Sequence, residues 1–200
     1  MTVSNFWIHT KFLLIFIKLQ NHVKFKGPYY KGILDVYGIS QDPNTKEYIL
    51  VTRYANNQSL TDYLTKNLKN LKWEDKIEIL YRIISGLSSI HQEQLVHHDF
   101  HSGNILHSDM IYHKVLIADL GLSVSADQEP SSIMGVLPYI APEVLNRKPY
   151  TQKSDIYSFG TLMTVISTGQ QPFYNIAHDR NLAFKICEGL RPDFSINTKI

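Results

Sequence analysis

The sequence lacks paired cysteines, and it has no clear excess of one charge. Its single cysteine, Cys187, excludes an internal disulfide framework and is typical of a reducing compartment, so we expect a cytoplasmic protein. Twenty basic and 18 acidic residues leave a formal net charge of +2, and the basic residues are scattered. This distribution excludes the basic footprint of a nucleic-acid or anionic-membrane binder.

The chain also lacks a long hydrophobic run near its start. Six apolar residues, Phe12 to Ile17, stand between Lys11 and Lys18. A membrane-spanning helix needs about 20 apolar residues, and no small-residue cleavage site follows that would indicate a signal peptide. We therefore expect a buried helix here.

Glycine is too dispersed to form a phosphate-binding loop. None of the ten glycines has another glycine two residues away, so the chain contains no G-x-G motif. At 44% hydrophobic residues, the 200 residues are nevertheless enough for one core, or for a core with a small satellite lobe.

The pattern that is present predicts a few strands followed by helices. Two β-rich runs, Gly32–Ile39 and Glu47–Tyr54, flank the turn-rich segment QDPNTK and predict a hairpin. A helix is predicted from Trp73 to about Gln92, because the positions Ile77, Leu80, Ile84, Leu87 and His91 follow steps of three and four and mark one helical face. The other expected elements are a strand ending at Asp119, a core helix over Ser154–Thr168 and a shorter helix over Asp179–Glu188.

The stretch LVHHDFHSGNILH, Leu95–His107, holds four of the nine histidines and raises the question of a metal site. Metal-binding histidines need convergent geometry, whereas adjacent His97 and His98 point to opposite sides of an extended backbone. No pair of cysteines or histidines recurs elsewhere at ligand spacing. Solvated loop histidines would be a second explanation, but it leaves the order of residues around Asp99 unexplained.

That order carries the functional prediction. HHD at residues 97–99 is followed by Asn104, then by DLG at 119–121 and YIAPE at 139–143. It resembles the protein kinases, whose catalytic loop reads H-R-D-x-x-x-x-N, whose metal-binding loop reads D-F-G, and in which A-P-E follows. A lone H-x-D would be a weak signal, whereas several motifs in the family's order are a specific one.

The resemblance extends over about residues 11–192 and implies an α+β, bilobal kinase fold. Residues 1–53 would form a partial N-lobe (a helix plus a β-hairpin), and residues 54–200 the hinge and a mostly helical C-lobe. Within the family, DFHSGNIL and GVLPYIAPEVL are most similar to the tyrosine-kinase-like group of the type expanded in some fungi. The resemblance also implies that the chain is a kinase domain truncated at both ends.

The resemblance assigns roles to individual residues. Asp99 would accept the proton of the substrate hydroxyl, and Asn104 and Asp119 would hold Mg²⁺, which prefers oxygen ligands. His97 would brace the loop from inside, and Asp155 would hold the catalytic loop through backbone N–H groups. The residues expected to support the site structurally are His97, Gly121, Glu143 and Asp155.

The nucleotide would lie against the segment Leu50–Leu64, which resembles the strand and hinge that carry adenine. Thr52 would stand at the gatekeeper position and Leu106 at the floor of the pocket, while Ser59 is either a ribose contact or a plain helix N-cap. The residues expected at ATP are Thr52, Arg53, Tyr54, Ala55, Ser59, Leu106 and Ala118.

Several departures from the family pattern affect activity. The chain has no glycine-rich loop and no strand lysine, and Ile15 stands where the glutamate partner of that lysine would be. From these absences we expect the 200 residues alone to bind ATP only at about millimolar concentration and to transfer no phosphoryl group. His101 stands where Ser/Thr kinases usually have lysine, and Val136 where threonine is frequent, yet Gly135 favours Ser/Thr over Tyr specificity.

Regulation is expected to be unusual as well. His98 replaces the arginine that pairs with a phosphorylated activation loop, so we expect activity without loop phosphorylation unless a protonated His98 replaces the arginine at low pH. The candidate phosphorylation sites are Ser123, Ser125, Ser131 and Ser132.

Three functions remain open from the sequence. The first is an ATP- and Mg²⁺-dependent protein kinase with an unknown protein substrate, and without nucleic-acid or membrane partners. The second is a pseudokinase that acts as a binding or scaffold module. The third is a chain with no stable product.

Overall fold

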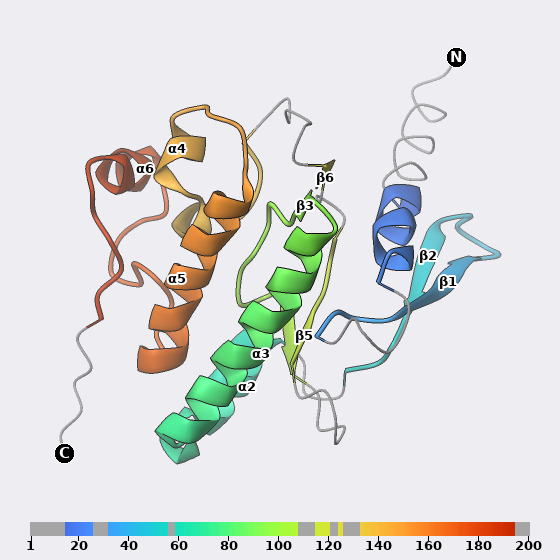
Figure 1. Cartoon of the computed structure of the whole chain (residues 1–200), viewed down its shortest axis with the longest axis horizontal. Helices are drawn as coiled ribbons and strands as arrows, with labels where there is room; N and C mark the ends of the chain where they lie inside the picture. Colours follow the sequence, from blue (N-terminus) through green and yellow to red (C-terminus); the bar gives the residue numbers. More distant parts are fainter. Residues whose placement is uncertain are drawn as a thin grey trace.

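The structure, a computed structural model, describes residues 15–25, 32–55, 59–107, 115–120, 124–125 and 133–194. It is an α+β arrangement of small two-stranded sheets and helices, which confirms the predicted fold class (Figure 1). After a helix over residues 15–23, the elements are β1 Val36–Gln41, β2 Tyr48–Thr52, α2 Leu60–Asn67, the 3₁₀ helix η1 Leu68–Asn70, α3 Trp73–Gln92, β3 Leu95–Val96, β4 Ile105–His107, β5 Val115–Ile117, β6 Val124–Ser125, the 3₁₀ helix η2 Leu137–Tyr139, α4 Pro142–Leu145, α5 Gln152–Thr168 and α6 Arg180–Cys187.

The predicted hairpin is confirmed. Strands β1 and β2 pair antiparallel, from Gln41 opposite Tyr48 to Val36 opposite Thr52, with an irregularity beside Gly38. Asp42 closes the turn, because its Oδ1 accepts hydrogen bonds from the backbone N–H groups of the residues two and three positions on. The strands are shorter than the apolar runs, since the first of those runs begins in an irregular segment.

The N-terminal helix is confirmed over residues 15–17 of the apolar run, but its burial is only partial. Phe16 remains 41% exposed, while the buried positions come one turn later, at Asn21 and His22. The prediction of a buried helix was therefore wrong for Phe16, because the helix packs through its polar residues. Residues 12–14 lie outside the described part of the chain.

Helix α3 has the predicted bounds but buries a different face. The fully or nearly fully buried residues are Ile79, Ile83, Leu87 and Ile90, whereas Ile77 is 60% exposed. Both sets obey the same three-and-four spacing, so periodicity alone does not fix which stripe meets the core. The core itself joins α3 to α5 and to strands β4 and β5.

Helices α5 and α6 are confirmed close to their predicted ends. Asp179 caps α6 by accepting hydrogen bonds from two backbone N–H groups of its first turn. Gly169 ends α5 in the left-handed region at φ 73°, the conformation that favours glycine at a helix C-terminus. α5 is not buried all round, however, because Ile156 and Met163 remain exposed.

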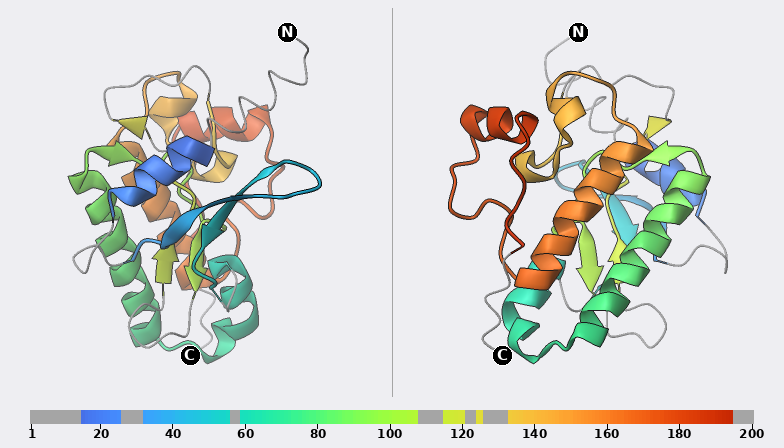
Figure 2. Two further views of the ribbon diagram at one scale, coloured as in Figure 1. Left: turned by 90° about the vertical axis from the view of Figure 1, so that its right-hand side faces the viewer. Right: turned by 60° about the vertical axis from the view of Figure 1, so that its left-hand side comes forward.

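Helices α3 and α5 lie alongside each other through the middle of the molecule (Figure 2). The segment before β1 runs beside β5, where the Leu34 N–H donates to the Ile117 carbonyl and the Ile117 N–H donates to the Gly32 carbonyl. A Cβ on Gly86 of α3 would lie 2.9 Å from the Gly32 carbonyl oxygen, so the chain can cross α3 here only over glycine. This crossing fixes the N-terminal elements against β5.

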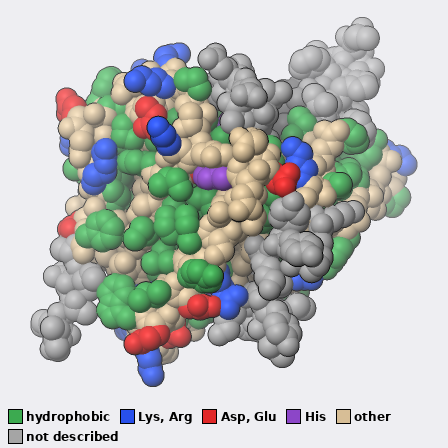
Figure 3. All heavy atoms as spheres, viewed as in Figure 1, with side chains coloured by type: hydrophobic (Ala, Val, Ile, Leu, Met, Phe, Trp, Pro, Cys, Tyr) green, Lys and Arg blue, Asp and Glu red, His purple; other side chains and the backbone are tan. Residues whose placement is uncertain are grey.

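Hydrophobic side chains are exposed on the face seen in Figure 3. The exposed hydrophobic residues of the molecule include Ile77 and Tyr81 of α3 and Ile156 of α5. Within the described residues, no helix has both the length and the hydropathy to cross a bilayer. The arrangement leaves the residues between β3 and β4, and those after β5, next to one another, which is where the site is found.

Candidate active site

The loop after β3 is held in place by one buried carboxylate. Asp155, 1% exposed, accepts hydrogen bonds from the backbone N–H groups of His97 at 2.8 Å and His98 at 3.2 Å. Its Oδ2 also lies 2.9 Å from Nε2 of His91 in α3. Asp155 does not cap its own helix, whose N-cap is Thr151. It holds the loop instead, as the resemblance implied.

His97 and His98 point to different neighbours. The Asp99 N–H donates to Nδ1 of His97, and Nε2 of His97 lies 3.1 Å from the Ala118 carbonyl, which together require the neutral tautomer with hydrogen on Nε2. His98 has a left-handed backbone at φ 71° and stacks on the Tyr150 ring at 4.4 Å. Among the described residues, no group of three or more His, Cys, Asp and Glu side chains could hold a metal ion.

The two carboxylate oxygens of Asp99 face different neighbours, Asn104 and His101. Asn104 Nδ2 donates to Oδ2 of Asp99 at 3.1 Å and to its carbonyl at 2.9 Å, while the buried Oδ1 lies 3.4 Å from Nε2 of His101. Burial raises the pKa of the Asp99 carboxyl, but hydrogen bonding and charge from His101, with smaller contributions from His97 and Asn104, outweigh it and hold that pKa below its ordinary value. The carboxylate is therefore ionised at neutral pH and able to accept a proton or a hydrogen bond.

Asp119 lies beside this loop. The Ala118 N–H donates to the Asn104 carbonyl at 2.8 Å, which brings the residue before Asp119 against the loop. Asp119 has a left-handed backbone at φ 57°, a conformation uncommon outside glycine and found at functional sites. Its Oδ1 forms an ion pair of 2.8 Å with Nζ of Lys18.

The donor set at this point suits Mg²⁺. Asn104 uses its amide nitrogen toward Asp99, which leaves its amide oxygen as the side-chain acceptor, and the Asp119 carboxylate is 43% exposed. Carboxylate and amide oxygens with room for water are the ligands that this small, hard cation prefers. Asn104 and Asp119 therefore fit the predicted ion.

One of the residues predicted to bind the nucleotide, Arg53, already makes contacts within the protein. The Arg53 N–H already donates to the Asp35 carbonyl at 2.9 Å, and the Arg53 guanidinium pairs with the Asp35 carboxylate at 2.8 Å. Contact between adenine and backbone groups of Arg53 to Ala55 stays a prediction, with the Arg53 carbonyl, rather than the Arg53 N–H, as the group of that residue that would bind. Thr52 ends β2, and the Tyr54 side chain is 81% exposed.

The floor of the predicted pocket is apolar. Leu106 of β4 packs with Leu34, Leu116 and Ala118 in one small cluster. Ser59 is the N-cap of α2, where its Oγ and the Asp62 carboxylate form a capping box. Of the two roles expected for Ser59, the N-cap is confirmed, and a ribose contact stays a prediction.

The structure describes only some of the remaining predicted residues. Glu143 lies in the first turn of α4, and Ser125 belongs to β6, which pairs with β3. Four predicted residues lie outside the described part of the chain: Gly121, Ser123, Ser131 and Ser132.

Gly135 closes over the catalytic loop. Its backbone has φ 105°, and a Cβ there would lie 3.2 Å from the His98 carbonyl oxygen and 3.3 Å from Oδ1 of Asp99. We expect Gly135→Ala to cost about 1 kcal/mol or more of folding stability, because an L residue is strained at this φ. The Gly135→Ala variant should also lower any transfer activity by displacing Asp99.

Gly160 of α5 provides the control, because a Cβ there would meet open space. Gly160→Ala should instead raise the unfolding free energy by about 0.5–1 kcal/mol, measured by urea unfolding. Equal behaviour of the two variants would contradict this account.

His98 is neutral over the physiological range. Burial lowers its pKa to about 4, and the nearby Asp155 charge only partly offsets that effect. The hypothesis that a protonated His98 pairs with a phosphate group on the activation loop near pH 6 is therefore not supported. The His98 imidazole is neutral at that pH, and it is only 6% exposed.

This shift predicts a pH dependence of stability. The folded pKa is lower than the unfolded value, so the stabilising contribution is complete above about pH 6.5 and is lost as the pH falls toward 4. We expect the unfolding free energy to fall by up to about 1.4 kcal/mol per pH unit for each such histidine, and burial lowers the pKa of His22 to about 4 as well. Urea unfolding between pH 7.5 and 4.5 measures the slope, which His98→Phe should reduce. The same change at the exposed His178 should not alter it.

Three residues that contact the site were not predicted. Lys18 reaches Asp119, Asn21 Nδ2 donates to the Leu120 carbonyl at 3.0 Å, and His91 contacts Asp155. Lys18 and Asn21 are three residues apart and thus share a helix face, a signal that was available once the helix was predicted. His91 gave no such signal, because its position also fitted an apolar stripe.

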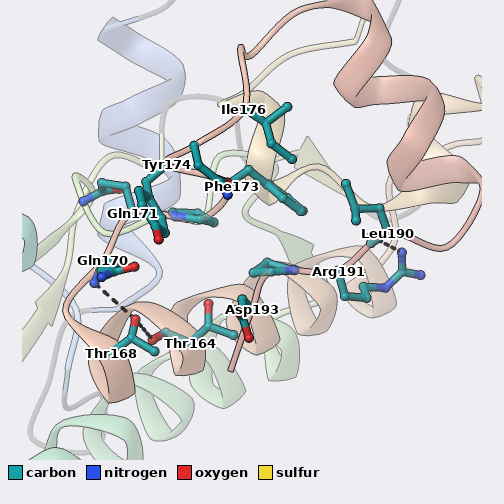
Figure 4. Close-up of a pocket in the computed structure, with 13 residues that line it drawn as sticks. Thr164, Thr168, Gln170, Gln171, Phe173, Tyr174, Ile176, Leu190, Arg191 and Asp193 are labelled. Carbon is teal, nitrogen blue, oxygen red and sulfur yellow. Dashed lines mark hydrogen bonds between the residues drawn. The ribbon is translucent and has the colours of Figure 1, made fainter. Parts of the chain in front are cut away.

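A separate hollow of about 160 Å³ lies between the C-terminal half of α5 and the chain on both sides of α6 (Figure 4). Thr164, Thr168, Phe173 and Ile176 contribute to its lining. The Arg191 guanidinium beside it donates to the carbonyls of Leu190 and Ile186, so its hydrogen bonds are directed to the protein backbone. The hollow shares no lining residue with the loop that carries Asp99.

Comparison with known proteins places this geometry in a family. Residues 17–198 match the protein kinase domain model. The chain is 33% identical over 129 residues to the serine/threonine/tyrosine-protein kinase HT1 of Arabidopsis thaliana, an alignment that covers 63% of the chain and 33% of that protein. It is 31% identical over 160 residues to the serine/threonine-protein kinase PLK4 of Nematostella vectensis, covering 78% of the chain and 16% of that protein.

A third relative is a tyrosine kinase. The cytoplasmic tyrosine-protein kinase BMX of Homo sapiens is 31% identical over 183 residues, which cover 88% of the chain and 26% of that protein. The chain thus spans a third or less of the length of these relatives, and they include both serine/threonine and tyrosine kinases. The matched domain, the α+β fold and the grouping of Asp99, Asn104 and Asp119 agree, and the chain belongs to the protein kinase family.

Proposed function

We propose that the protein transfers the γ-phosphoryl group of ATP to hydroxyl groups of a protein substrate with the help of Mg²⁺. The observation that carries the proposal is that Asp99, Asn104 and Asp119 lie close together. Two hydrogen bonds connect them: Asn104 Nδ2 donates to the Asp99 carbonyl, and the N–H of Ala118, the residue before Asp119, donates to the Asn104 carbonyl. Phosphoryl transfer asks a protein mainly for positioning and for neutralisation of charge, and this group offers both.

Each residue has a distinct task in this proposal. Oδ1 of Asp99 would accept the substrate hydroxyl proton and orient that oxygen. Asn104 and Asp119 would hold Mg²⁺, which supplies neutralisation of the phosphate charge when bound. His97 and Asp155 keep the backbone of the loop in place, since both are buried and bonded to backbone groups.

The nucleotide would lie between the hinge and β4. The Arg53 carbonyl and backbone groups of Tyr54 and Ala55 would meet adenine, and Leu106 and Ala118 would form the apolar floor. In this proposal, residues 1–53 are the N-lobe portion and residues 54–200 the hinge and C-lobe portion. A cytoplasmic location stays a prediction from the single cysteine.

Serine and threonine are the hydroxyls that we favour. The support is Gly135, the residue that favoured Ser/Thr specificity in the sequence and whose Cβ position lies 3.3 Å from Oδ1 of Asp99. The relatives include both serine/threonine and tyrosine kinases and do not decide between them. The motifs DFHSGNIL and GVLPYIAPEVL further support membership of the tyrosine-kinase-like group.

A second function is favoured by one observation. The Lys18 ammonium lies on the Asp119 carboxylate that Mg²⁺ would need. If this ion pair persisted with nucleotide present, the protein would serve as a binding module rather than as an enzyme.

The test is transfer of label from γ-labelled ATP to a generic protein substrate, followed by identification of the labelled amino acid. The 200 residues alone are expected to transfer no label, because they lack a glycine-rich loop and a strand lysine. In a longer protein that contains these residues together with both features, we expect label on serine and threonine, lost when EDTA removes Mg²⁺. Binding of ATP without transfer would favour the binding module. If the protein neither bound ATP nor transferred label, both the kinase function and the binding-module function would be contradicted.

A further inference from the structure

Lys18 places a positive charge at the centre of the candidate site. Its Nζ lies 2.8 Å from Oδ1 of Asp119, and the two side chains are 32% and 43% exposed. An ammonium group has three N–H donors, and one carboxylate oxygen accounts for one of them. The charge therefore faces both the protein and the solvent-accessible space where a ligand of Asp119 would bind.

The position of this lysine is fixed by the helix that carries it. Asn21, one turn further on, is buried and donates to the Leu120 carbonyl at 3.0 Å, and His22 beside it is also buried. Residues at i and i+3 share a helix face, so Lys18 and Asn21 form one contact surface against Asp119 and Leu120. The helix thus presents Lys18 to Asp119 as part of its packing.

The chemistry of this position suits an anionic ligand beside a metal-binding carboxylate. Lysine is a compact charge that binds phosphate groups well, and the 200 residues contain no G-x-G loop that could wrap phosphates. We propose that Lys18, on the helix over residues 15–23, binds the polyphosphate of the nucleotide. This assignment rests on the proposed function, in which Lys18 would be a residue that binds the phosphate groups of ATP.

The exposure of the pair argues for this role over permanent closure of the site. A half-exposed ion pair contributes little stability and opens readily, so a phosphate oxygen can replace the Asp119 oxygen as the partner of Lys18. Asp119 is then available to Mg²⁺, as the proposed function requires. A tight internal pair would instead exclude the metal ion and would weaken its binding.

The experiment compares phosphate-bearing and phosphate-free ligands on the purified protein. Ligand-detected NMR titrations would measure the dissociation constants of ATP and ADP with Mg²⁺, and of adenosine, for the parental protein and for Lys18→Met. We expect Lys18→Met to weaken ATP and ADP binding by at least about tenfold, the effect of losing a charge-assisted hydrogen bond. Adenosine binding should stay unchanged, which also shows that the variant is folded.

Two matched variants separate charge from position. Lys24→Met removes the same charge from an exposed site just beyond this helix and should leave all three ligands unaffected. Lys18→Arg keeps a cation at the site and should retain most of the affinity for ATP. Unchanged ATP binding by Lys18→Met would overturn the assignment, and tighter binding of ATP with Mg²⁺ would show that Lys18 blocks the metal. If the parental protein bound neither adenosine nor ATP, the proposed function itself would fail.

Discussion

Replacing Asp99 by asparagine, in a protein that also carries a glycine-rich loop and a strand lysine, is expected to lower phosphoryl transfer by about a thousandfold, within the range by which a positioned base accelerates proton transfer. The asparagine keeps the shape of the side chain and an oxygen that can accept from Asn104 Nδ2, so the loop should retain its conformation. What is lost is the ionised oxygen, which no neighbouring carboxylate replaces within hydrogen-bond distance in the described part of the chain. Initial rates with labelled ATP and a generic protein substrate measure the effect.

A matched control is available in the hairpin turn. Asp42 accepts two backbone hydrogen bonds through Oδ1 at an exposed position, and asparagine can accept the same bonds. Asp42→Asn should therefore transfer at the parental rate. A rate for Asp99→Asn within a factor of about ten of the parent, below the usual contribution of a general base, would show that Asp99 is not the base.

The fold was predictable where local sequence chemistry decides it. The bounds of α3 followed from its periodicity, and the turn at Asp42 followed from the residues that favour turns. The buried stripe of α3 did not follow, because Ile77 and Ile79 both satisfy a helical period and only packing against β5 and α5 distinguishes them. The same limit applied to Phe16, whose helix packs through Asn21 and His22 instead.

The candidate site was predictable as a set of residue types in order, but not as a set of contacts. The motif named Asp99, Asn104 and Asp119 without indicating that Lys18 would lie at Asp119. That contact joins residues about a hundred positions apart, and it depends on how the N-terminal helix crosses the segment after β5. Likewise, the hinge pattern could not show that the Arg53 N–H is used by Asp35, since this bond depends on the pairing of the chain beside β1.

Removal of the Asp155 carboxylate is expected to have the largest effect on stability. In Asp155→Ala, the backbone N–H groups of His97 and His98 and the imidazole of His91 lose their common acceptor. Both N–H groups belong to buried residues, and each unsatisfied buried donor costs about 1–3 kcal/mol. We expect the unfolding free energy to fall by about 3 kcal/mol or more, measured by urea denaturation at pH 7.5.

The variants around Asp155 distinguish loss of the loop anchor from a general loss of stability. Asp155→Asn keeps one acceptor oxygen and should lose less stability than Asp155→Ala, because only one of the two N–H groups must face an amide nitrogen. In α3, the exposed Asp75 accepts one backbone hydrogen bond from Lys72, so Asp75→Ala should cost no more than about 1 kcal/mol, the usual contribution of a capping interaction. At a temperature where every variant is folded, transfer should fall in Asp155→Ala but not in Asp75→Ala, since only Asp155 positions the backbone next to Asp99. Equal stability of Asp155→Ala and Asp75→Ala would mean that water satisfies the His97 and His98 N–H groups, and that the buried carboxylate is not what holds the catalytic loop.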